Sequence, residues 1–243
     1  MTKRFNDQLL QEFTQNFYGY GNYNGKYWFI GMEEGGGKKF QELENRLTAW
    51  DKRGKRELED VAEYHAEIEM THFFNERPKL QTTWSKLIRI LLSIEGQRAT
   101  TNQVRDYQRS SLARSNANHC LLELLPLPSP RTGDWLYTRY SRLAYLATRE
   151  SYKQSCLAPR VAHLKRRITK YEPKVIIFYS FRYRQHWQEI ASVDFSLNES
   201  DGVYIGYNEP SVFIVTKHPC ARGVTNEYFH RVGEIALAKI AEH

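Results

Sequence analysis

Residues 27–40 read YWFIGMEEGGGKKF, an apolar run followed at once by two carboxylates and three glycines. A short run rich in aromatic and branched side chains, ended by Gly, is typical of a buried β-strand. Three more runs have this character: CLLEL at 120–124, VIIFY at 175–179 and VFIVT at 212–216. Because helical segments separate the four runs, parallel pairing through crossovers is expected. The sequence therefore predicts an α/β fold, a three-layer α/β/α sandwich around a mostly parallel four-stranded sheet.

Helices are predicted where apolar residues recur at intervals of three and four. These segments are residues 5–17, 56–72, 82–95, 101–114, 139–150, 160–171 and 226–242. No repeat, low-complexity tract or Gly/Ser linker divides the chain, and its 243 residues suit one core. We therefore expect a single domain over residues 1–243, with a helical insertion at about 41–116.

Composition excludes several classes of protein. No apolar stretch approaches the roughly 18 residues that cross a bilayer, and the polar start MTKRFNDQLLQEF lacks the apolar middle of a secretion signal. Cys120, Cys156 and Cys220 stand far apart without a CxxC pair, which excludes a disulfide framework, a zinc ribbon and an all-cysteine iron–sulfur cluster. We therefore expect a cytoplasmic protein without membrane contact, cofactor or obligate protein partner, whose chemistry is metal-free or uses oxygen and nitrogen ligands.

The charge balance points to a polyanionic partner. The net charge is +7, and residues 77–116 and 159–186 each carry eight Lys or Arg, against two acids and one acid respectively. Acids gather instead in residues 41–76, where ten of them face five bases. Such separation lets one face approach phosphates, although solvated helix faces would produce similar charge runs. Charge and aromatic content together predict contact with nucleic acid.

Functional groups in parallel sheets gather beyond the carboxyl ends of the strands. This rule selects the loops at residues 32–39, 125–134, 180–184 and 217–225. The third loop supplies Ser180 and Arg182, which suit backbone phosphates, although arginines here would equally decorate the next helix. The second loop is too rich in proline for a strand or helix, and it predicts a rigid wall.

Two adjacent carboxylates, Glu33 and Glu34, stand in the first of these loops beside a glycine run. The loop is not a Walker A motif, because Lys38 is followed by Lys39 and not by Ser or Thr. A carboxylate held beside bare backbone can position water for hydrolysis or coordinate a divalent cation. The alternative is that the pair caps the following helix through its dipole.

The last loop holds His218, which Pro219 and the start of the final helix place in a rigid turn. An imidazole at a strand end can donate a hydrogen bond to a leaving group or act as an acid. The alternative is a surface or structural histidine. Its place opposite an acidic glycine loop favours the catalytic interpretation.

In this order the four segments resemble motifs of the uracil-DNA glycosylase superfamily. GMEEG at 31–35 is similar to the family's strand end of the type Gly-Gln-Asp-Pro-Tyr or Gly-Glu-Ala-Pro-Gly, which positions water. HPCAR at 218–222 is similar to its His-Pro-Ser segment, CLLE at 120–123 to its base-recognition strand Leu-Leu-Leu-Asn, and YS at 179–180 to a Gly-Ser strand end. The resemblance implies a uracil-DNA glycosylase-like fold, here without an iron–sulfur cluster.

The activity that this resemblance implies is that of a monofunctional DNA glycosylase, which flips a base out of DNA and hydrolyses its N-glycosidic bond. The implied catalytic residues, which position water and stabilise the departing base, are Glu33, Glu34 and His218. The implied base pocket consists of Gly31, Met32, Gly35 and Glu123. The implied DNA contacts, the last of them a wedge, are Ser180, Arg182, Lys217 and Arg222.

Glu123 departs from the family pattern, because it stands where uracil recognition uses an amide. A carboxylate only accepts hydrogen bonds, so it suits the exocyclic amine of cytosine better than a carbonyl of uracil. We therefore hypothesise a modified cytosine as substrate, in DNA repair or in defence against phages with modified DNA. Two alternatives stay open: a non-catalytic nucleic-acid-binding protein on the same scaffold, and a metal-dependent nuclease in which a cation is bound by Glu33, Glu34, His218 and Asp134.

Overall fold

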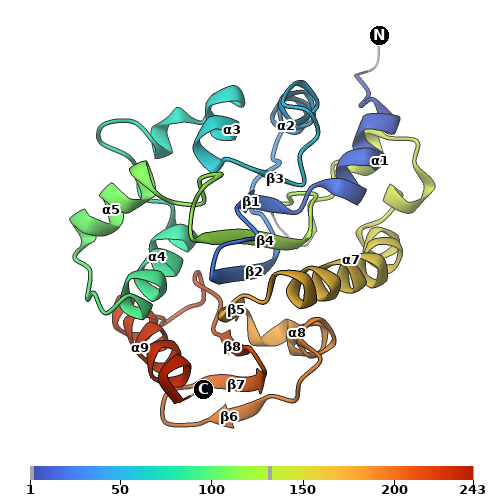
Figure 1. The fold of residues 1–243 in the computed structure, drawn as a ribbon. Helices are drawn as coiled ribbons and strands as arrows, with labels where there is room; N and C mark the ends of the chain where they lie inside the picture. Colours follow the sequence, from blue (N-terminus) through green and yellow to red (C-terminus); the bar gives the residue numbers. More distant parts are fainter. Residues whose placement is uncertain (1–2, 131–132, 243) are drawn as a thin grey trace.

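The computed structural model describes residues 3–130 and 133–242, and within them the chain forms one mixed, eight-stranded sheet (Figure 1). The strands are β1 (Gly19–Gly21), β2 (Tyr27–Glu33), β3 (Leu58–Glu59), β4 (His119–Leu125), β5 (Val175–Tyr179), β6 (Ser196–Asn198), β7 (Val203–Asn208) and β8 (Ser211–Thr216). They lie in the order β3-β1-β4-β2-β5-β8-β7-β6. The predicted α/β class is confirmed.

Helices lie on both faces of this sheet. The α-helices are α1 (Asp7–Asn16), α2 (Phe40–Lys52), α3 (Val61–Glu67), α4 (Thr82–Ile94), α5 (Thr101–Ser110), α6 (Tyr137–Tyr140), α7 (Arg149–Tyr171), α8 (Arg184–Ala191) and α9 (Asn226–Glu242). The short 3₁₀ helices are η1 (Thr71–Phe73), η2 (Ala144–Leu146) and η3 (Phe181–Tyr183). Figure 1 shows α4, α5 and α9 on one side of the sheet and α1, α7 and α8 on the other.

The four strands predicted from apolar runs form the centre of the sheet. β4, β2, β5 and β8 are neighbours in that order and pair in parallel, so that Ile30 has Leu122 on one side and Phe178 on the other. The expectation of only four strands is wrong, because the outer strands add the antiparallel pairs β1–β4, β7–β8 and β6–β7. These outer strands are short or partly exposed, so no continuous apolar run reveals them.

Helix prediction succeeded where the apolar period was regular. The helices expected near 5–17, 82–95, 101–114 and 226–242 are present as α1, α4, α5 and α9. The helix predicted at 139–150 is wrong, because α7 begins only after Thr148, whose side chain caps it, and then continues through Pro159. The apolar spacing did not give bounds for α2 or α8, and the segment at 56–72 forms only the shorter α3 and part of η1.

A buried arginine joins α1, β4 and α7. The Arg160 side chain lies inside the protein, and its guanidinium donates hydrogen bonds of 2.6–3.0 Å to the backbone carbonyls of Thr14, Phe17, Glu123 and Leu124. Buried carbonyl groups at chain turns need such donors, and a guanidinium supplies several in one plane. The carboxyl end of β4 is therefore held in place from the side of α7.

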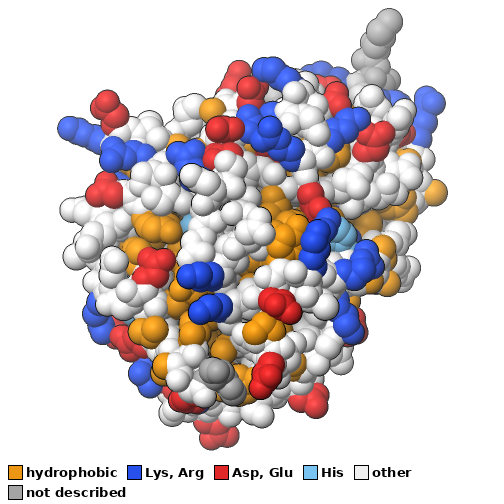
Figure 2. All heavy atoms as spheres, in the orientation of Figure 1, with side chains coloured by type: hydrophobic (Ala, Val, Ile, Leu, Met, Phe, Trp, Pro, Cys, Tyr) orange, Lys and Arg blue, Asp and Glu red, His pale blue; other side chains and the backbone are white. Residues whose placement is uncertain are grey.

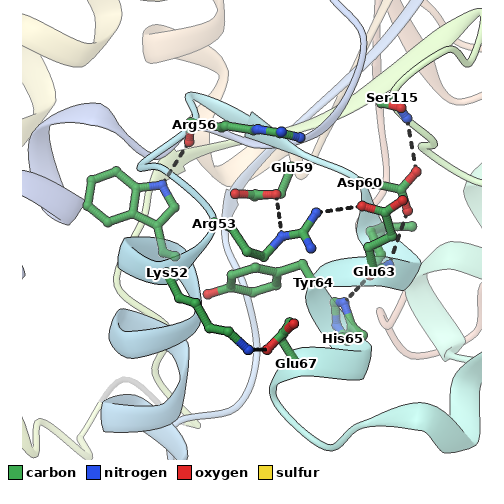
Figure 3. Close-up of polar contacts among 12 residues, drawn as sticks. Lys52, Arg53, Arg56, Glu59, Asp60, Glu63, Tyr64, His65, Glu67 and Ser115 are labelled. Carbon is green, nitrogen blue, oxygen red and sulfur yellow. Dashed lines mark hydrogen bonds and ion pairs between the residues drawn. The ribbon is translucent and has the colours of Figure 1, made fainter.

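The acidic segment at 41–76 forms ion pairs both within itself and with other parts of the chain. Arg53 lies between Glu59 and Glu63, at 2.8 Å and 2.7 Å, and Lys52 pairs with Glu67 at 2.8 Å (Figure 3). The face shown in Figure 2 accordingly carries basic and acidic side chains interspersed, with no single sign dominating it. On this face, the charge runs of the sequence do not appear as a surface of one sign.

Residues 3–130 and 133–242 contain no helix that combines the length and the apolar character needed to span a membrane.

Glu57 is the centre of a polar cluster that joins the segment before β3 to α7. Its carboxylate accepts hydrogen bonds from Tyr23 at 2.7 Å and from Arg167 at 2.5 Å, and it also pairs with His163. Burial alone would raise the pKa of Glu57, but the hydrogen bonds from these three partners lower it to about 2.

Replacing Glu57 by Gln will lower the free energy of unfolding near pH 7 by about 2 kcal/mol, because a carboxyl whose pKa is lower in the folded state stabilises the fold when ionised. This contribution is complete above the unfolded pKa of 4.5 and is lost as the pH falls toward 2. Urea unfolding near pH 7 and near pH 3 measures it, with the exposed Glu199→Gln as control. An equal loss at both pH values would contradict this account.

Candidate functional site

A cavity of about 780 Å³ opens at the carboxyl ends of β2, β4 and β5. Strand residues form its inner wall, and the outer wall comes from η1 and the start of α4, where Phe73, Thr82 and Trp84 face it. Its volume lies in the range of roughly 300–1,000 Å³ that is usual for ligand sites. This cavity is therefore the candidate functional site.

Most residues singled out in the sequence line this cavity. They are Met32, Glu33, Glu34, Gly35, Glu123, Ser180, Arg182 and His218. They come from four neighbouring strands or the loops that follow them, so the parallel order of β4, β2, β5 and β8 brings them together.

Three of the predicted residues do not line it. Gly31 lies beneath the ring of Tyr179. Lys217 and Arg222 are exposed on the turn after β8, and Lys217 Nζ stands 5.0 Å from the centre of the Tyr228 ring. Within the proline-rich loop at 125–134, residues 131–132 lie outside the described part of the chain.

The inner wall of the cavity depends on a glycine. Gly31 of β2 is the register partner of Glu123 on β4, and β5, which ends at Tyr179, lies on the other side of β2. The Tyr179 side chain crosses over Gly31, and its hydroxyl donates a hydrogen bond of 2.8 Å to Glu123 Oε1. A Cβ at position 31 would overlap the Tyr179 ring and hydroxyl, so only glycine leaves this path open.

Glu123 has the environment of a neutral acid. Burial raises the pKa of its carboxyl well above the usual range, and the nearby Glu34 carboxylate raises it further, whereas the Tyr179 hydrogen bond lowers it. Glu123 Oε2 is buried and has no hydrogen-bond partner among the described residues. A raised pKa favours the protonated form, which donates as well as accepts, whereas the expectation from the sequence is a group that only accepts.

Glu33 is held at the end of β2 by Arg149, the first residue of α7. The Arg149 guanidinium pairs with Glu33 Oε1 and donates to Ser129 Oγ at 2.9 Å. Burial raises the pKa of Glu33, and Arg149 acts in the opposite direction. Glu33 Oε2 is buried without a hydrogen-bond partner among the described residues, so it is the oxygen of this carboxylate that Arg149 does not engage.

Glu34 is engaged differently. Its Oε2 forms an ion pair of 2.6 Å with Arg46 of α2, whose side chain is almost fully buried. The hydroxyl of Tyr64 donates to the Arg46 backbone carbonyl at 2.9 Å, which ties α3 to the same point. Because the Glu34 carboxylate compensates the buried Arg46 guanidinium, its loss would leave an unpaired buried charge. Glu33 is therefore the better candidate for positioning water.

His218 faces the cavity from the turn after β8. Its Nδ1 accepts a hydrogen bond of 3.1 Å from the backbone N–H of Cys220, which places the ring proton on Nε2. Burial lowers the pKa of the imidazole, so the neutral form is favoured. The ring lies edge-on to Tyr179, with centroids 6.0 Å apart. His218 can thus donate one hydrogen bond into the cavity.

Several residues of the site were not predicted from the sequence. They are Tyr20, Arg46, Trp84, Arg149 and Tyr179. Tyr179 could have been found, since it ends a predicted strand at the edge where function gathers. The arginines come from helices far away in sequence, and no local pattern connects them to the carboxylates that they pair with.

Among the described residues, no group of three or more His, Cys, Asp or Glu side chains is arranged to hold a metal ion. Asp134, the fourth ligand in the nuclease alternative, is not part of the described cavity lining. No protein-family model and no curated protein matches the chain. The cavity is lined by the Glu33 carboxylate, the His218 imidazole and the Glu123 carboxyl, groups that can accept and donate protons.

Replacing Gly31 by Ala will lower the free energy of unfolding by about 1–3 kcal/mol, because Tyr179 must leave its place above β2 and release Glu123. Gly35→Ala is the matched control, since a Cβ at that glycine meets no atom within 4 Å. Urea denaturation measures both variants. Equal stability of the two would show that Tyr179 does not depend on the space above Gly31.

Proposed function

We propose that this protein is a monofunctional DNA glycosylase of the uracil-DNA glycosylase type, which hydrolyses the N-glycosidic bond of a modified base flipped out of DNA. One observation carries the proposal: Glu33 and His218, from distant parts of the chain, line one cavity together with Glu123. The first offers a carboxylate oxygen, the second an N–H donor, and the third a group that can recognise a base edge. The motif resemblance to that superfamily supports the same proposal.

Hydrolysis of this bond needs groups at both of its ends. As the bond breaks, the sugar gains oxocarbenium character and the base gains negative charge. Glu33 accepts a proton from the attacking water and stabilises the positive sugar. The Nε2–H of His218 donates to an oxygen of the departing base, a contribution of about 3 kcal/mol when the donor is held in place.

DNA contacts must offset the cost of base flipping, which is a few kcal/mol. Ser180 and Arg182 follow β5 and line the cavity, where a hydroxyl and a guanidinium suit the sugar–phosphate backbone of the flipped nucleotide. Lys217 and Arg222 are exposed on the turn between β8 and α9. From there Lys217 would contact flanking phosphates, and Arg222 would act as the wedge that fills the vacated stack.

The cavity has more room than one pyrimidine ring requires. Its volume of about 780 Å³ falls in the upper part of the usual range for ligand sites. The side away from the sheet is lined by Met70 just before η1, Phe73 of η1 and Trp84 of α4. A substituted base therefore fits the site, in keeping with a modified cytosine in DNA repair or in defence against phages with modified DNA.

The two alternatives lead to different products. A metal-dependent nuclease would cut the DNA backbone and stop in EDTA, and the described residues hold no cluster suited to its cation. A non-catalytic binding protein is favoured by one observation, that Glu33 and Glu34 are both ion-paired with arginines. Release of a free base, with an alkali-labile abasic site left in the DNA, distinguishes the glycosylase from both.

Replacing Glu33 by Gln will slow base release by a factor of about 10²–10⁴, because the attacking water loses its base. Glu34→Gln will lower stability but keep more activity per folded molecule, since Glu34 pairs with the buried Arg46. Oligonucleotides carrying uracil, hydroxymethyl or glucosylated pyrimidines supply the substrates, and mass spectrometry identifies the released bases. A wild-type rate in Glu33→Gln would remove Glu33 from the mechanism.

The acid side of the pH profile reports Glu33, which must be ionised to act as a base. Because its pKa is raised, kcat/KM will increase with pH above the usual carboxyl range. Arg149→Met removes the cation that lowers this pKa, so the acid limb will move to higher pH, whereas Arg149→Lys will move it less. If the acid limb stays at the same pH in both variants, Arg149 does not influence the ionisation of Glu33.

A further inference from the structure

No described cation forms an ion pair with the Glu123 side chain, although the charge of Arg160 acts on its carboxyl and lowers its pKa. From the end of β2 and the residue after it, the carboxylates of Glu33 and Glu34 act on it, and from β5 the Tyr179 hydroxyl donates to its Oε1. Arg160 of α7 lies behind β4, but its guanidinium donates to backbone carbonyls, including that of Glu123. Glu123 Oε2 is buried and without a partner among the described residues, and the side chain lines the cavity.

A carboxyl group in this environment keeps its proton. Removal from water disfavours the charged form, and two nearby carboxylates, each paired with its own arginine, disfavour a third negative charge. Because Oε1 accepts the Tyr179 hydrogen bond, the proton lies on Oε2. This O–H group is buried and belongs to a side chain that lines the cavity on the wall opposite the helical segment.

We propose that Glu123 is the general acid of this site and that it protonates the ring nitrogen of an aminopyrimidine, the cytosine class of base. The inference rests on the proposed glycosylase function and names its substrate class. Cytosine presents a ring nitrogen that accepts the Oε2–H and an adjacent amine that can donate to the surrounding carboxyl oxygens. Uracil presents an N–H at that ring position, so this N–H and the Glu123 O–H, both hydrogen-bond donors, would face each other.

The protons and electron pairs of the step balance. Glu123 Oε2 transfers its proton to the ring nitrogen N3, the N1–C1′ bond breaks, and its electron pair stays on the base, which leaves as a neutral molecule. Water adds to C1′ and gives one proton to Glu33. Exchange with solvent returns that proton to Glu123, so the net reaction consumes one water and restores both carboxyl groups.

Glu123→Gln tests the proton transfer. Glutamine can still accept from Tyr179 and donate an N–H to the ring nitrogen, but it has no proton to transfer. On an oligonucleotide with a substituted cytosine, KM is expected to change by less than about threefold, while kcat falls by a factor of about 10²–10⁴. The wild-type kcat will also fall as the pH rises through the pKa of Glu123, and this limb will be absent in the variant. An unchanged kcat overturns the proposal.

A binding measurement tests recognition without turnover. Trp84 lines the cavity, so tryptophan fluorescence reports the binding of free cytosine and free uracil. The wild type is expected to bind cytosine at least about tenfold more tightly, which one well-placed base-edge contact can supply. Glu123→Ala should lose this preference, with thermal unfolding as the check that it folds. Equal affinity of the wild type for both bases overturns the substrate class.

Together the two measurements separate this inference from the proposed function. If the wild type releases no base from any oligonucleotide but prefers cytosine through Glu123, the glycosylase proposal fails and base recognition by Glu123 is supported. If the wild type releases uracil and Glu123→Gln does so at the same rate, the glycosylase stands and Glu123 is not its acid.

Discussion

The candidate site depends on one hydrogen bond, from the Tyr179 hydroxyl to Glu123, which spans three neighbouring strands. It forms because β5, β2 and β4 lie side by side in parallel and because the middle strand carries Gly31 at the crossing point. The bond gives a buried carboxyl one partner and leaves its other oxygen on the cavity side. Since interiors are close-packed, a shift of β5 against β2 would also move the carboxyl. The same hydrogen bond therefore contributes to the packing of the core and fixes the geometry of the site.

The carboxyl groups around the cavity are placed in different states by their partners. Glu33 is paired with Arg149 from α7, and Glu34 has a guanidinium from α2, whereas Glu123 has only the phenol of Tyr179. Proteins obtain an acid and a base in one site by placing groups of one chemical type in surroundings that push their pKa values apart. On this view the charged carboxylate on β2 and the neutral carboxyl on β4 act at opposite ends of the same bond.

The helical segment between β2 and β4 completes the cavity. It supplies the wall that faces the sheet, including Phe73 and Trp84, and it brings Arg46 to the end of β2. Its many acids are largely used in ion pairs, as the contacts of Arg53 illustrate. A segment that reads as an acidic run in the sequence therefore serves to shape a binding site.

The sequence by itself determined the α/β class, the four central strands and the position of Glu33 and His218 at strand ends, because apolar runs and the residues that end them are local signals. It did not reveal the outer strands, which are short or exposed, or α2 and α8. Only the tertiary structure decided which arginine pairs with which carboxylate and that Glu123 lies near Glu33 and Glu34 with a tyrosine as its side-chain hydrogen-bond partner. The physical reason is that the charge state of a side chain depends on burial and on neighbours brought from distant parts of the chain, which no local pattern records.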